Sequence, residues 1–235
     1  MELRRIQKGV AKVVPLHHCE VKARKEESLV SKQSLRLCQE RASKAIPEIL
    51  EEIEKSPHPV KTRDPQWAAI HRLYGYLEAY ITSIYGKRTG VFANMRVKEV
   101  RNAIGDDQMG YLINVAENKT MASHGYAQIY LLKEEMGWFQ KWLALRSRSV
   151  PKSTYFFVTA WAGPPKNLVT YLRNAWREMG LPKSRSFYDI RTAVCTYNYR
   201  DTDPSLREDA ANFMNHGIES HKRLPCIKTL AEHSE

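Results

Sequence analysis

The clearest alternation of apolar and polar residues in this chain begins at Asp64. From there apolar side chains recur every three or four positions, which is the spacing of one face of an α-helix. These positions are Trp67, Ile70, Leu73, Tyr74, Leu77, Tyr80, Ile81 and Ile84. Asp64 followed by Pro65 is typical of a helix N-terminus, since aspartate caps backbone N–H groups and proline fits the first turn. Gly86 is the expected C-terminal cap, so one buried helix is predicted between these residues.

The segment before that helix, residues 22–56, contains many helix-forming residues but few apolar ones ahead of Ile46. It predicts one or two helices that must pack against another part of the chain. We expect a break at Pro47, because proline lacks the N–H group that a helix interior needs. The stretch "SPHPVKTRDP" has no apolar periodicity and several prolines, so it is interpreted as a linker. The predicted organisation is a helical N-terminal segment with its linker over 1–61 and a second domain over 62–235.

The pattern changes in "GYLINVAENKTMASHGYAQIYLL", at residues 110–132. Leu112, Ile113 and Val115 predict a strand, Glu117 to Lys119 a turn, and 127–132 a return strand. Helical spacing is found on both sides of this hairpin. The predicted helices cover 94–104, 133–146, 166–180, 186–200 and 204–216, and "YFFVTAW" at 155–161 predicts a buried strand or extended segment. The expected fold class is therefore mainly α with a small antiparallel β-sheet.

Composition adds a preference for polyanionic partners. The chain has 37 Lys and Arg against 26 Asp and Glu, a formal net charge of +11, and such a balance favours nucleic acid. No apolar run is long enough to span a bilayer, and the basic N-terminus lacks the apolar core of a signal peptide. We therefore expect no membrane partner and a nuclear protein if the source is eukaryotic, otherwise a cytoplasmic one. The four cysteines form no C-x-x-C pair, which argues against a disulfide framework or a zinc ribbon.

Four basic residues stand at the ends or turns of the predicted elements. Arg88 in "GKRTGV" follows the end of the first long helix, and Lys119 in "AENKT" lies at the hairpin turn. Arg191 in "YDIR" is near the start of a later helix, and His216 in "FMNH" ends the helix after it. Each string is short, so the order and the element types carry the information.

In this order the sequence resembles the catalytic domain of tyrosine recombinases, especially the divergent recombinase-like proteins of eukaryotic transposons. The resemblance covers roughly residues 62–224, where the family has an arginine, a hairpin lysine, an H-x-x-R helix, a second histidine and a tyrosine. It implies that Arg88 and Arg191 clamp a scissile phosphate, that Lys119 protonates the leaving oxygen and that His216 contacts the phosphate. No metal or other cofactor is then expected. The family's N-terminal helical domain completes a clamp around DNA, so residues 1–61 are interpreted as a degenerate core-binding domain.

Two positions depart from the family's pattern. Tyr188 occupies the histidine position of H-x-x-R, where a phenol can still donate a hydrogen bond to phosphate. The family's tyrosine lies about nine residues after the second histidine, and this distance from His216 leads to Pro225. No tyrosine follows Tyr199, and Cys226 offers a thiol in place of a phenol. The resemblance therefore implies a DNA-binding protein derived from a transposable-element recombinase, with impaired strand cleavage.

Other interpretations stay open. Singly, the two arginines could be structural ion-pair partners, Lys119 a solvated turn residue and His216 a favourable charge at a helix C-terminus. The potential metal ligands His216, His221, Cys226 and His233 do not have the spacing of a usual zinc site. Function also has alternatives: an active recombinase with an unlocated nucleophile, or a protein-interaction module with a basic surface. For the DNA-binding hypothesis the expected partner is double-stranded DNA. The resemblance also implies that copies of the protein associate with one another on DNA.

Overall fold

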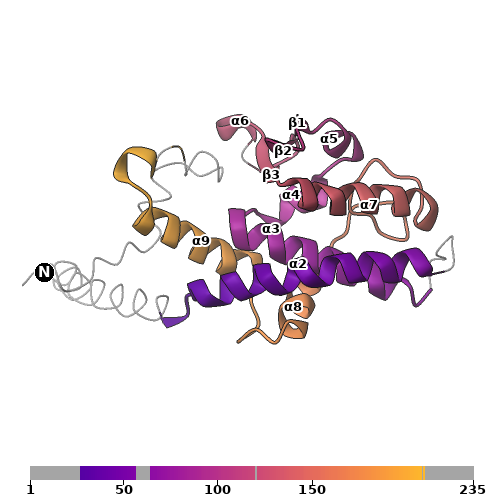
Figure 1. Ribbon diagram of the computed structural model, residues 1–235, viewed down its shortest axis with the longest axis horizontal. Helices are drawn as coiled ribbons and strands as arrows, with labels where there is room; N and C mark the ends of the chain where they lie inside the picture. Colours follow the sequence, from indigo (N-terminus) through magenta and orange to yellow (C-terminus); the bar gives the residue numbers. More distant parts are fainter. Residues whose placement is uncertain (1–26, 57–63, 120, 208, 210–235) are drawn as a thin grey trace, which may run out of the picture.

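The computed structural model describes residues 27–56, 64–119, 121–207 and 209 of the chain (Figure 1). In the described part the helices are α2 (Lys32–Lys55), α3 (Trp67–Tyr85), α4 (Thr89–Asn94), α5 (Val97–Arg101), α6 (Met121–His124), α7 (Lys133–Ser149), α8 (Leu168–Glu178) and α9 (Phe187–Asp201), followed by the 3-10 helix η1 (Pro204–Leu206). The strands are β1 (Ile104–Asp106), β2 (Gly110–Val115) and β3 (Ala127–Leu131). The predicted class, mainly α with a small antiparallel sheet, is confirmed.

Helix α2 runs without interruption through Pro47, so the predicted break is wrong. Its N-terminus is capped by Ser31, whose side chain accepts a hydrogen bond from the Ser34 N–H at 3.1 Å. Its apolar face is buried against α3, with further contacts to α7 and α9. This packing outweighs the hydrogen bond that proline removes, which propensity alone does not predict. The described part of the N-terminal segment therefore shares one hydrophobic core with the rest of the described chain. The predicted domain division stays a prediction, as does the linker, most of which lies outside the described residues.

Helix α3 is the central element and is buried along most of its length. It begins at Trp67, after a turn in which the Asp64 carbonyl accepts from the Trp67 N–H at 3.1 Å, slightly later than predicted. Its neighbour α8 approaches very closely at Gly75, where a Cβ atom would collide with the backbone carbonyl of Tyr171. As predicted, Gly86 ends the helix in the left-handed conformation, with φ of 57°.

The sheet has the strand order β1-β2-β3 with both pairs antiparallel. The predicted hairpin is confirmed: Ile113 pairs with Ile129, and both are fully buried. Strand β1 and helix α4 were not predicted. All of β1 is exposed, so it lacks the apolar signal on which strand prediction depends. Helix α4 spans only 6 residues, too few to show a helical period.

The extended segment 155–158 packs in the core against α3 and α7. Phe156 and Phe157 are fully buried, and the Trp142 indole N–H donates to the Phe156 carbonyl at 3.2 Å. Tyr74 on α3 donates to the Val158 carbonyl at 3.1 Å. Trp161, just beyond this segment, is 83% exposed and contributes nothing to the core. None of the helices in the described ranges is long and apolar enough to cross a membrane.

Candidate functional site

The first part of the site is the junction between α3 and α4. Gly86 adopts a left-handed conformation that reverses the chain at low cost only for glycine. Lys87 and Arg88 follow, and Arg88 is the N-cap residue of α4. The Tyr85 hydroxyl donates to the Tyr130 carbonyl at 2.7 Å, which ties this junction to strand β3. Two consecutive basic residues are thus held on a short connection with both ends anchored.

The second part is the start of α9. Ser186 and Asp189 form a capping box: the Ser186 N–H donates to Asp189 Oδ2 at 2.7 Å, and Asp189 N donates to Ser186 Oγ. This cap sets where the helix begins, and Arg191 then lies on its buried side. The Arg191 guanidinium donates a hydrogen bond to the Gly86 carbonyl. Arg191 therefore meets the α3–α4 junction, although 105 residues separate it from Gly86 in the chain.

Lys87, Arg88 and Arg191 form what we term the basic cluster. Lys87 is only 1% exposed, and burial together with the charges of Arg191 and Arg88 lowers the pKa of its ammonium to about 7. Burial also lowers the pKa of Arg191 to about 10. Cys195 acts to raise this pKa, and the charge of Arg88 lowers it further. Burial likewise lowers the pKa of Arg88. The cluster gathers like charges in a poorly solvated place, an arrangement favourable for holding an anion.

Cys195 lies one turn after Arg191 and is fully buried. Burial raises the pKa of its thiol to about 11, although Arg191, Arg88 and Lys87 all act to lower it. The thiol therefore stays protonated near neutral pH and is not an activated nucleophile. Cys195 is thus a small residue of the hydrophobic core.

Of the other predicted site residues, Tyr188 and Lys119 are exposed, and His216 lies outside the described residues. Tyr188 is on α9 one turn before Arg191 and is 67% exposed. Lys119 is exposed in the turn after β2. His216, Pro225 and the tail residues considered as metal ligands lie outside the described residues.

Lys87 is the member of the cluster that sequence reasoning missed. It precedes Arg88 directly in "GKRTG", but neighbouring lysines in a sequence are usually solvated. Its burial depends on the packing of α9 against the end of α3, which a local pattern does not reveal. Among the described residues, no group of three or more His, Cys, Asp or Glu side chains could hold a metal ion.

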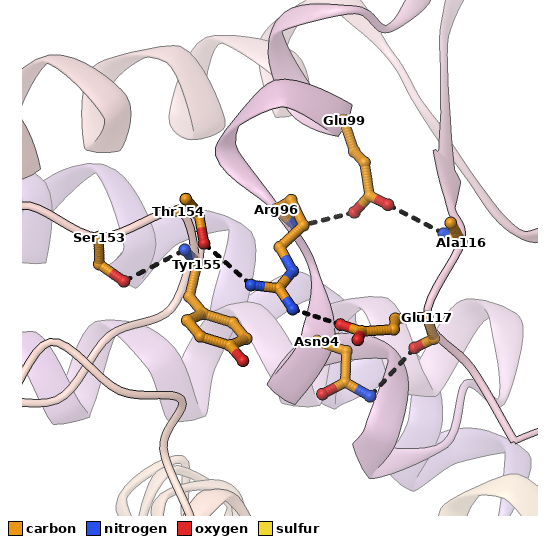
Figure 2. A network of polar contacts seen from close by, with 8 residues as sticks. All are labelled: Asn94, Arg96, Glu99, Ala116, Glu117, Ser153, Thr154 and Tyr155. Atoms are coloured by element: carbon orange, nitrogen blue, oxygen red, sulfur yellow. Dashed lines mark hydrogen bonds and ion pairs between the residues drawn. The ribbon is translucent and has the colours of Figure 1, made fainter.

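A polar network lies at the C-terminal end of α4, which is Asn94 (Figure 2). Arg96, between α4 and α5, forms an ion pair with Glu117 and donates to Thr154 Oγ1 at 2.9 Å. A groove of about 670 Å³ adjoins this network. Its lining includes Lys98 and Arg101 but none of the basic cluster, so the groove is separate from the cluster.

Comparisons with known proteins identify the fold. The sequence matches no family model, and a search of curated proteins finds no significant match. Among solved structures, the chain is similar to XerA recombinase, with a TM-score of 0.54 and 14% identity over 83% of this chain and 56% of that one. Others are the Tn1549 transposon integrase in complex with transposon right end DNA (TM-score 0.43, 18% identity, 79% and 60% covered) and a lambda integrase dimer bound to a COC′ core site (0.41, 14%, 77% and 57%).

The similarity to XerA shows a shared fold, and it confirms the predicted tyrosine-recombinase-like architecture. The chain spans just over half of the XerA chain that it matches, 56% of its length. At 14% identity the similarity assigns no role to any side chain of this protein.

Proposed function

We propose that this protein binds double-stranded DNA as a relative of the tyrosine recombinases, with the basic cluster holding the phosphate backbone. The observation that carries the proposal is the meeting of Lys87, Arg88 and Arg191 at the α3–α4 junction, in a chain with a recombinase fold. A guanidinium group can donate two parallel hydrogen bonds to the oxygens of one phosphate. A bound anion also offsets the mutual repulsion of neighbouring cations. The net charge of +11 adds long-range attraction to a polyanion.

We further propose that strand cleavage is impaired. The resemblance places the attacking tyrosine at position 225, where this chain has proline, and proline has no nucleophile. The buried thiol of Cys195 does not replace it, because its pKa is raised to about 11. The protein would then retain phosphate binding without forming the covalent phosphotyrosine.

DNA binding is tested by fluorescence anisotropy of a labelled random duplex at two salt concentrations. We expect Arg88→Ala and Arg191→Ala each to weaken binding roughly tenfold or more, since a charged hydrogen bond contributes about 1.5–3 kcal/mol. A matched control is Arg148→Ala, which removes the same charge from the far end of α7, where Arg148 lies 3.9 Å from Glu54. Binding that is insensitive to salt, or equal for all variants, would favour the protein-interaction alternative.

Cleavage is tested separately with a nicked duplex that traps covalent intermediates on a denaturing gel. We expect the wild-type protein to give no shifted protein–DNA band. A band would support the alternative, an active recombinase with an unlocated nucleophile, and substitution of each exposed tyrosine, Tyr188 first, would then locate it.

A further inference from the structure

The turn that carries Lys119 is held residue by residue. Ala116, Glu117 and Asn118 precede Lys119, and each makes hydrogen bonds outside the β2–β3 ladder. Figure 2 shows the residues that hold Ala116 and Glu117 coming from the end of α4 and the start of α5, while Thr154 and Tyr155 contact Arg96. Such density of contacts is unusual for an exposed turn, which normally lacks fixed partners.

Glu99 on α5 supplies the first contacts. One carboxylate oxygen accepts the Arg96 N–H at 2.7 Å, and the other accepts the Ala116 N–H at 2.9 Å. The side chain is thus a helix cap and a bridge to the end of β2 at once. Because both oxygens accept from backbone N–H groups, a glutamine at this position would present an amide N–H₂ to one donor.

Arg96 and Asn94 hold Glu117. The Arg96 guanidinium lies 3.8 Å from the centre of the Tyr155 ring and pairs with the Glu117 carboxylate. The Asn94 side-chain amide donates to the Glu117 carbonyl at 3.1 Å. Both the side chain and the backbone of Glu117 are therefore fixed. In addition, Asn118 donates across the neck of the loop to the Gly125 carbonyl at 3.1 Å.

Helix α4 links this network to the basic cluster. Arg88 caps its N-terminus and Asn94 is its last residue. The helix spans 6 residues, and at a rise of 1.5 Å per residue it is about 9 Å long. It therefore sets a short, rigid separation between Arg88 and the backbone two residues before Lys119.

We propose that Asn94, Arg96 and Glu99 are positioning residues, a clamp that presents Lys119 to the same DNA backbone that the basic cluster binds. This proposal rests on the proposed function and adds a role for residues outside the cluster. A lysine on a loose turn loses conformational freedom when it binds phosphate, whereas one on a clamped backbone loses less. The clamp residues themselves need not touch DNA.

Glu99→Gln tests the clamp because simple electrostatics and the clamp predict opposite changes in DNA affinity. The substitution removes a negative charge, so simple electrostatics predicts tighter DNA binding. The clamp predicts binding about threefold weaker, through the loss of one fixed phosphate contact. It also predicts a salt dependence, log K against log salt, that is shallower by about 0.9, the value for one phosphate contact. Glu54→Gln is the matched control, since Glu54 pairs with Lys141 at 3.0 Å and belongs to neither the clamp nor the basic cluster. The DNA binding of this variant should be unchanged or slightly tighter.

A double-mutant cycle supplies the second readout. Lys119→Ala should weaken DNA binding in the wild-type background. In the Glu99→Gln background it should weaken DNA binding little further, because the phosphate contact of Lys119 is already lost. Additive effects, or tighter binding by Glu99→Gln, would overturn the proposal. If Glu99→Gln fails to fold by circular dichroism, Asn94→Ala takes its place, since it removes only the hydrogen bond to the Glu117 carbonyl.

Failure of the clamp and failure of DNA binding can be told apart. If Arg88→Ala and Arg191→Ala leave DNA binding intact, the proposed function fails. If they weaken it while the cycle is additive, only the clamp fails. Hydrogen exchange of the amides at 116–119 without DNA gives an independent check: Glu99→Gln should speed exchange at least tenfold across this turn, and unchanged exchange would refute the clamp.

Discussion

The basic cluster and the clamp are neighbours at opposite ends of α4, yet they treat charge in opposite ways. In the clamp, Arg96 meets the carboxylate of Glu117, and Glu99 meets two backbone N–H groups. In the cluster, Lys87 and Arg191 are buried beside Arg88, and the pKa of each is lowered. The clamp brings a guanidinium to a carboxylate, whereas the cluster brings like charges together, and they lower one another's pKa.

This difference separates charged side chains that hold neighbouring segments together from like charges whose repulsion a bound anion would offset. Arg146 illustrates the first kind: it is also a buried arginine, but its guanidinium donates to the Ser153 and Tyr155 carbonyls at 3.3 and 2.7 Å. Arg191 likewise donates to a backbone carbonyl, that of Gly86, so burial and carbonyl hydrogen bonds do not distinguish the two arginines. They differ in their neighbours: Arg88 and Lys87 both lie near Arg191, whereas Arg101 is the cation that acts on Arg146.

The largest effect should come from removing the buried charge of Lys87. Lys87→Met keeps the apolar bulk and should raise the free energy of unfolding near pH 7 by roughly 2–5 kcal/mol, at 1.36 kcal/mol per unit of pKa shift. The folded-state pKa is about 7 and the ordinary value is 10.5, so between these values the unfolded chain binds more protons. Wild-type stability therefore rises with pH across this window, and the advantage of the variant shrinks.

Urea denaturation at pH 6.5, 8 and 9.5 measures this difference. The exposed Lys55, whose side chain is 78% accessible, provides the control Lys55→Met, which should show no comparable pH dependence. A stability gain for Lys87→Met that is absent, or that stays constant over the pH range, would show that the cluster does not hold a costly charge.

An intermediate effect is expected at the clamp, with the opposite sign. Glu99→Gln should lower the free energy of unfolding by about 1–3 kcal/mol, because one part-buried backbone N–H loses its charged acceptor. For a chain of this size that corresponds to a fall in melting temperature of about 2–4 °C per kcal/mol. Thermal unfolding followed by circular dichroism measures it, and Glu40→Gln, on an exposed pair with Lys44 at 2.8 Å, is the control. An unchanged melting temperature would mean that the hydrogen bonds of Glu99 to the Arg96 and Ala116 N–H groups do not stabilise the fold.

The smallest effect is expected for the exposed half of the clamp. The Glu117 side chain is 60% exposed, and ion pairs of this kind contribute about 0–1 kcal/mol. Glu117→Gln should therefore cost less than Glu99→Gln, and the cost should decrease further in high salt, where exposed charges are screened. Parallel denaturation of the two variants at low and high salt would decide; a larger loss for Glu117→Gln would place the strength of the clamp in its ion pair.

Local signals in the sequence predicted much of the fold. The apolar period of α3, its Gly86 cap and the hairpin of β2 and β3 were predicted because each depends on neighbouring residues. Where prediction failed, the deciding contacts were distant. Pro47 does not interrupt α2, because packing on α3 and α7 holds the helix together. Strand β1 is exposed throughout, so no apolar alternation indicated it.

The candidate site divides in the same way. The sequence by itself determined that Arg88 follows a glycine-capped helix and that Arg191 lies within the first turns of another, because caps and helix periods are short-range properties. Only the tertiary structure decided that α9 packs against the end of α3 and brings the Arg191 guanidinium to the Gly86 carbonyl. That packing buries Lys87 and lowers its pKa, because desolvation and like-charge repulsion depend on which surfaces meet in space.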